Sequence, residues 1–128
     1  MGEPRWLSRL IVDAIHSELL LEHGGAPSVR AGGDDLLESA LVRPNYEPDS
    51  DLATLAAAYL FGLVKNHGYV DGNKRVAFAA AATFLPLNGR KLPASETEAY
   101  DAVIEAADGR RIEPDLADWL RANTEAVR

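Results

Sequence analysis

The residues between positions 67 and 75 combine side chains that could transfer a phosphate group. His67 can accept a proton near neutral pH, and Asp71 can hold a magnesium ion that bridges phosphates. Gly72 permits backbone angles at which successive amide groups converge on an anion, and Lys74 and Arg75 follow it as two cations. A base, a carboxylate, a glycine turn and two cations at this spacing predict phosphoryl or nucleotidyl transfer.

Two strongly apolar runs flank this polar segment and predict the helices that position it. Residues 52–64 and 76–85 are apolar nearly all round a helical projection, which is typical of helices buried on several sides. Asp51 opens the first run. Pro86 is expected to kink or end the second helix, and the turn beyond it falls at 88–89. A rigid support of this kind is what a transfer site needs.

Helical periodicity recurs along the rest of the chain, and no segment alternates convincingly between apolar and polar residues. The pattern predicts an all-α protein. Further helices are expected at 7–21 with a stop at 24–25, at 34–42 with Asp34 as its cap, from the capping-box pair Ser95 and Glu98 to 108–109, and from Pro114 onward. Residues 43–50 contain two prolines and predict either an exposed loop or a flap that aligns a target segment by strand addition.

Composition narrows the class of protein further. A chain of 128 residues with 47% apolar content is long enough for one hydrophobic core, so we expect one domain over 1–128. Cysteine is absent, which excludes thiolate chemistry. The net charge of −7 argues against nucleic acid as a direct partner, because phosphate backbones require clustered cations. No apolar run reaches the roughly 20 residues of a membrane span, and Glu3 and Arg5 do not suit a signal peptide, so we expect a cytoplasmic protein and no membrane partner.

The segment 67–75 resembles the Fic/Doc motif H-x-F-x-D-[GA]-N-[GK]-R, with Tyr69 in the place of phenylalanine. The similarity extends to positions 24–25, 36–41, 43–44, 84–85 and 88–89. It implies a single-domain Fic/Doc-like helical bundle in which two central buried helices flank the motif loop. It also implies a bacterial death-on-curing (Doc) type toxin of a toxin–antitoxin pair.

The resemblance assigns a role to each motif position. It makes His67 the general base, Asp71 the magnesium ligand, Gly72 and Asn73 the anion-binding turn, Lys74 and Arg75 further nucleotide and phosphate ligands, and Tyr69 the structural anchor of the motif.

Lys74 decides which reaction the resemblance favours. Fic enzymes that transfer AMP have glycine at this position and a second arginine three residues after the motif arginine, where this chain has Phe78. The Asn-Lys-Arg ending is instead that of Doc toxins, which transfer the terminal phosphate of ATP to a protein hydroxyl, with elongation factor Tu as a known target. The resemblance therefore implies a protein kinase that uses ATP and Mg²⁺, inhibits translation, and is inhibited by an antitoxin with a disordered tail. Adenylyl transfer, a silent helical binding module and, more remotely, a helix-turn-helix regulator are the alternatives.

Other conspicuous residues have ordinary structural interpretations. His16 and His23 lack partners at metal-ligand spacing, and the glycine pair 32–33 matches no phosphate loop. All are interpreted as structural. Glu38 lies within the resemblance, and a helix-surface or capping role is as good an interpretation as a functional one.

Overall fold

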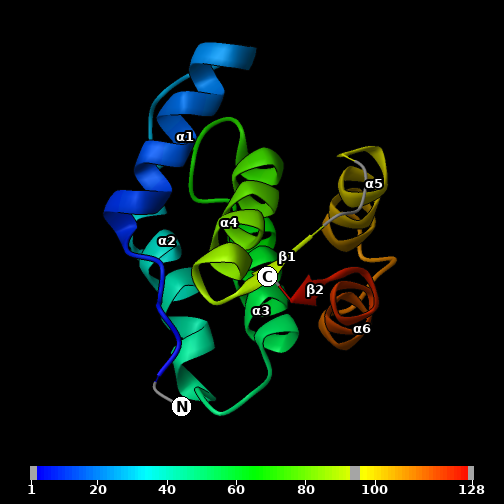
Figure 1. Cartoon of the computed structure of the whole chain (residues 1–128). Helices are drawn as coiled ribbons and strands as arrows, with labels where there is room; N and C mark the ends of the chain where they lie inside the picture. The colour runs from blue at the N-terminus through cyan, green and yellow to red at the C-terminus, as the bar shows by residue number, and fades with distance from the viewer. Residues whose placement is uncertain (1–2, 93–95, 127–128) are drawn as a thin grey trace.

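Two buried helices form the centre of the molecule (Figure 1). A computed structural model describes residues 3–92 and 96–126. Helix α3 (Leu52–Asn66) packs along helix α4 (Asn73–Leu87), and small buried alanines on both helices let their backbones approach closely. The two elements correspond to the two apolar runs of the sequence, as predicted.

The remaining helices cover this central pair from two sides (Figure 1). On one side lie α1 and α2, and on the other lie α5 and α6. Their bounds are α1 (Arg9–His23), α2 (Gly33–Val42), α5 (Glu96–Ala107) and α6 (Glu113–Asn123), with a 3₁₀ helix η1 (Arg43–Tyr46) after α2. A short antiparallel ribbon pairs β1 (Arg90–Lys91) with β2 (Glu125–Ala126). The predicted all-α class is confirmed, and the ribbon is too short to produce an alternating pattern in the sequence.

Local capping explains where the helices begin and end. The Asp51 carboxylate accepts the Thr54 N–H at 3.0 Å and starts α3, while Gly24 ends α1 in a positive-φ conformation, both as predicted. The prediction that Asp34 caps α2 is wrong. Gly32 is the N-cap in a left-handed conformation, and Asp34 lies in the first turn. The Ser95 half of the predicted capping box lies outside the described residues.

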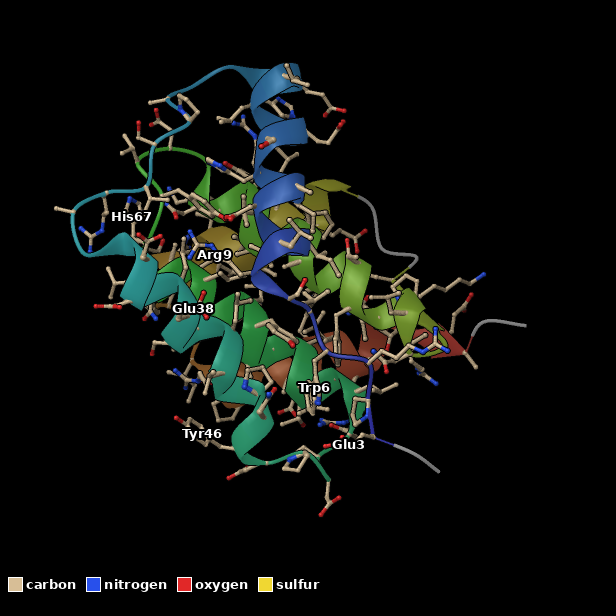
Figure 2. The ribbon with its side chains drawn as sticks, turned by 90° about the vertical axis from the view of Figure 1, so that its left-hand side faces the viewer. Glu3, Trp6, Arg9, Glu38, Tyr46 and His67 are labelled. Atoms are coloured by element: carbon tan, nitrogen blue, oxygen red, sulfur yellow. The ribbon has the colours of Figure 1, made fainter. Side chains whose placement is uncertain are left out.

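The structure also excludes residues 43–50 as a flap over the motif. They form η1 and a turn before the first residue of α3, whereas the motif follows its last residue. A helix of 15 residues is about 22 Å long, so its whole length separates the two segments. Figure 2 shows Tyr46 and His67 toward opposite ends of the molecule. The exposed-loop alternative is closer to the structure.

Membrane insertion through a helix has no support in the described part of the chain. None of its helices combines the length and the apolar character that a bilayer crossing requires.

Tyr59 ties the extended N-terminal segment to the core and provides a test of the packing. Its hydroxyl oxygen accepts the backbone N–H of Leu7 at 2.9 Å, and burial raises the pKa of its phenol. We expect Tyr59→Phe to lower the free energy of unfolding by about 1–3 kcal/mol, because the buried Leu7 N–H loses its partner. Urea unfolding measures the loss. The control is Tyr46→Phe, whose ring is 77% exposed, and equal stability of the two variants would contradict the assignment.

Candidate active site

His67 stands at the point where α3 ends and the motif loop begins. Its backbone N–H still bonds to the Leu63 carbonyl at 3.3 Å, but φ is 52° and ψ is 53°, so the residue adopts the left-handed conformation that ends a helix. It is the only non-glycine residue with positive φ among residues 3–92 and 96–126. This turn leaves the imidazole exposed next to the loop.

Asn73 fixes the shape of the loop from the inside. It is the first residue of α4 and is 4% exposed. Its Oδ1 accepts the Tyr69 N–H at 3.0 Å, and its Nδ2 donates to the Tyr69 carbonyl at 2.8 Å. Both polar groups of the side chain are therefore used by the loop backbone. What Asn73 offers to an anion is its own backbone amide in the first turn of α4.

Tyr69 anchors the loop in the core. Its ring is buried and stacks on His16, with 3.7 Å between ring centroids, and its hydroxyl donates to Asp13 Oδ1 at 2.6 Å. Burial and the bond to Asp13 raise the pKa of Tyr69, so the phenol keeps its proton. The Tyr69 hydroxyl, which the phenylalanine of the Fic/Doc motif lacks, thus has a hydrogen-bond partner.

An ion-pair network on α1 and α2 supports this anchor. Arg9 bonds to Asp13 and to Asp34, at 2.9 Å each, and reaches Glu38 at 3.5 Å. Burial by itself would lower the pKa of Arg9, but the bonds to Asp13 and Asp34 outweigh that effect and raise it. Figure 2 shows Arg9 and Glu38 side by side. Glu38 therefore lies on the surface of α2, at the edge of this network.

The connection between α1 and α2 runs along the outer side of the motif loop. Val29 pairs with Tyr69 in an isolated antiparallel bridge. The Arg30 N–H donates to the Gly68 carbonyl at 3.0 Å, and the Val70 N–H donates to the Ser28 carbonyl at 2.9 Å. This segment, and not residues 43–50, is the strand-like neighbour of the motif.

Gly68 allows this close approach. A Cβ atom there would lie 2.5 Å from Leu37 Cγ, and one on Gly33 would lie 2.2 Å from the Gly68 carbonyl oxygen. Both positions therefore require glycine on steric grounds. The structural interpretation of the glycine pair 32–33 agrees with this contact.

Asp71 is held by its backbone and by one carboxylate oxygen. The His16 Nε2–H donates to the Asp71 carbonyl at 2.9 Å, and Asp71 Oδ2 accepts the Ala26 N–H at 2.8 Å. The residue is otherwise exposed, which leaves its second oxygen for a ligand. The described residues contain no cluster of three His, Cys, Asp or Glu that could form a complete metal cage. A single carboxylate suits magnesium, which takes its other ligands from water and substrate phosphates.

The predicted site residues meet in one cavity of about 230 Å³. Gly72, with φ 85°, starts α4 without a side-chain cap, so the amides of the first turn are unsatisfied donors. Lys74 and Arg75 lie in that turn, exposed, and neither forms an ion pair with any residue that the structure describes. The cavity is lined by His67, Val70, Asp71, Gly72, Asn73, Lys74, Arg75 and Tyr100. Tyr69 lies beneath the loop. A base, a carboxylate and an anion-binding helix end thus share one opening.

Sequence reasoning missed the residues that support the loop from α1. Arg9, Asp13 and His16 are spaced by four and three positions, so they lie on one face of the helix. His16 was interpreted as structural, and its bond to the motif backbone gives that role a location. The sequence did contain a signal for this role, because these three polar residues form a stripe along a helix that also has a buried apolar face.

Comparison with known protein families identifies a match that includes the motif loop and both of the helices that flank it. The model of the Fic/DOC family matches residues 6–85, which run from the network on α1 to the end of the buried part of α4. This chain belongs to the Fic/DOC family. The resemblance on which the motif roles depend is therefore confirmed as a family relationship.

Two relatives of this Fic/DOC chain carry descriptive names. "Toxin Doc" of Mycolicibacterium smegmatis is 49% identical over 76 residues, and the match covers 56% of this chain and 57% of that protein. "Protein kinase doc" of Escherichia phage P1 is 32% identical over 110 residues, covering 84% of this chain and 86% of that protein.

The double hydrogen bond of Asn73 generates a prediction about the loop. Asn73→Ala leaves two buried backbone groups of Tyr69 without partners, and we expect it to lower the free energy of unfolding by at least about 2 kcal/mol. Urea unfolding measures the stability, and amide exchange of Tyr69 reports the loop. Asn45→Ala, at an exposed asparagine in η1, is the control. Unchanged exchange of the Tyr69 amide would refute the role given to Asn73.

Proposed function

We propose that this chain is a Doc-type toxin that transfers the terminal phosphate of ATP to a serine or threonine hydroxyl of a protein. One observation carries the proposal: His67 and Asp71 open onto the same cavity as the cationic first turn of α4. The name of the phage P1 relative, a protein kinase that aligns with 84% of this chain, supports the choice of reaction.

The residues can perform the transfer in one displacement. His67 takes the proton of the target hydroxyl, whose oxygen attacks the γ-phosphorus while the bond to the β–γ bridging oxygen breaks and ADP leaves. The free amides at the start of α4, with Lys74 and Arg75, hold the phosphate oxygens in line. The exposed carboxylate of Asp71 would hold Mg²⁺, which would supply positive charge to neutralise the phosphates. The hydrogen bonds of Asn73 and Tyr69 beneath the loop hold these groups in fixed relative positions.

The remaining parts of the proposal concern partners. As a toxin this protein acts on a translation factor such as elongation factor Tu and inhibits translation in the cytoplasm. Its antitoxin carries a disordered tail that folds against the toxin. The name of the first relative, of which the match covers 57%, supports the toxin assignment. The acidic chain is not proposed to bind nucleic acid.

The role of His67 as the base can be tested with a variant that preserves the left-handed backbone conformation of this residue. We expect His67→Asn to lower the transfer rate by about a hundred- to ten-thousand-fold, because asparagine tolerates the left-handed conformation and cannot serve as the base. Transfer is measured with γ-labelled ATP and elongation factor Tu, and circular dichroism confirms the fold. His23→Asn, at an exposed histidine outside the motif, is the control. Transfer at the wild-type rate by folded His67→Asn would overturn the assignment.

Lys74 provides the test that separates the two transfer reactions. With α- and γ-labelled ATP used in parallel, the wild-type product is expected to carry only the γ label and to gain the mass of one phosphate. Lys74→Gly should reduce this phosphorylation, because the side chain both fills space and pairs with phosphate oxygens. Lys91→Gly, an exposed lysine in β1, controls for loss of charge. A wild-type product that carries the α label would replace phosphoryl transfer by adenylyl transfer.

A further inference from the structure

His16 of α1 lies at the centre of the contacts that hold the start of α4. Its imidazole is 4% exposed and stacks on the Tyr69 ring, with 3.7 Å between the ring centroids and 12° between the ring planes. A Cβ atom on Gly72 would lie 3.5 Å from His16 Cδ2, so the imidazole lies directly beside the residue that caps α4. This packing fixes the plane of the imidazole and therefore the direction in which its Nε2–H points.

Packing alone does not require a histidine at this buried position. Removing an imidazole from water costs free energy, and an apolar side chain could cover the Tyr69 ring without that cost. An apolar side chain cannot, however, donate a hydrogen bond. His16 Nε2 lies 2.9 Å from the Asp71 carbonyl oxygen, and because a carbonyl only accepts, this nitrogen carries the proton.

The Asp71 carbonyl belongs to the same planar peptide group as the Gly72 N–H. No cis peptide bond occurs among the described residues, so these two groups point in opposite directions. A bond that holds the carbonyl toward His16 therefore holds the Gly72 N–H away from His16. No carbonyl in the described part of the chain accepts this N–H, and Gly72 lines the motif cavity.

The backbone conformation at Gly72 makes its N–H part of the anion site. Gly72 is left-handed, with φ 85° and ψ 9°, and Asn73 after it is the first helical residue. Successive residues of opposite hand turn consecutive N–H groups toward one point, where they bind an anion. The amides of Gly72, Asn73 and Lys74 form this group. A rotation of the peptide between residues 71 and 72 would remove the first of the three donors.

We infer that His16 is a positioning residue for the transfer reaction, and that its hydrogen bond to the Asp71 carbonyl directs the Gly72 N–H at a phosphate oxygen. The inference rests on the proposed function, since it concerns the phosphates that the motif cavity binds in that reaction. His16 is not among the residues that line this cavity, so it acts through the peptide group and not on the substrate.

Two substitutions separate the hydrogen bond from the packing. His16→Gln has no ring but keeps a donor, because the glutamine Nε2 occupies the same position along the side chain as the histidine Nε2. His16→Phe keeps a ring on Tyr69 and has no donor. For phosphorylation of elongation factor Tu, we expect His16→Phe to lower kcat about tenfold to hundredfold and His16→Gln to stay within about threefold of the wild type. His23→Phe, at an exposed histidine in the last turn of the same helix, is the matched control.

A second measurement follows the Gly72 amide itself and does not require transfer. Inorganic tripolyphosphate is added with Mg²⁺ to the full chain, and the Gly72 amide resonance is followed by NMR. We expect this resonance to shift in the wild type and in His16→Gln, and the tripolyphosphate affinity to be about tenfold weaker in His16→Phe. His16→Leu is a second variant without a donor and should match His16→Phe. Urea unfolding confirms that each variant is folded.

Two outcomes would overturn the role of His16. One is wild-type kcat and tripolyphosphate affinity in folded His16→Phe, because packing would then be sufficient. The other is an equal loss in His16→Phe and His16→Gln, because the retained donor would then have no effect. Failure of the proposed function is recognised separately, by the label that reaches the protein target. An α-labelled product, together with the expected order of variants in the tripolyphosphate titration, would refute phosphoryl transfer and leave the role of His16 intact.

Discussion

The site depends on one constraint, which is the need to join two buried helices through a short loop that stays polar and partly exposed. Only residues 67–72 separate the last turn of α3 from the first turn of α4. Their backbone groups cannot be left unpaired where they enter the core. Asn73 meets this requirement by pairing with both backbone groups of Tyr69, and the strand-like segment 28–30 pairs with the opposite side of the loop. His67 can then remain exposed on a backbone that is fixed from within.

The same constraint explains why α1 belongs to the site although it contributes no lining residue to the motif cavity. The ring of Tyr69 needs an apolar surface, its hydroxyl needs an acceptor and the Asp71 carbonyl needs a donor. His16 supplies the surface and the donor, and Asp13 supplies the acceptor. Arg9 compensates the charge of Asp13 and connects it to α2. A displacement of α1 would therefore move the motif loop, even though α1 carries no residue that lines the motif cavity.

Charge is distributed unevenly over this acidic protein, and the distribution determines what the site can bind. Some arginines form ion pairs with carboxylates. Arg9 pairs with Asp34, and Arg121 pairs with Asp51. The bond from Arg121 holds the pKa of Asp51 below its ordinary value. Lys74 and Arg75 instead lie exposed in the first turn of α4, where the positive end of the helix dipole adds to their charge. A local anion site can thus exist on a chain whose net charge is −7.

Local sequence patterns were enough to predict the helical class, the two central helices, the stop at Gly24, the start at Asp51 and the residues of the motif. These features depend on helical periodicity and on contacts between residues no more than four positions apart, so a short stretch of sequence is enough to predict them. The sequence did not reveal that Gly32 caps α2, that residues 28–30 and not 43–50 flank the motif, or that Asp13 and His16 hold Tyr69 and Asp71. Each of these depends on atoms more than 25 positions apart, or on a backbone conformation that several residue types could adopt. Only tertiary packing selects among such contacts, because their partners become neighbours after the core has formed.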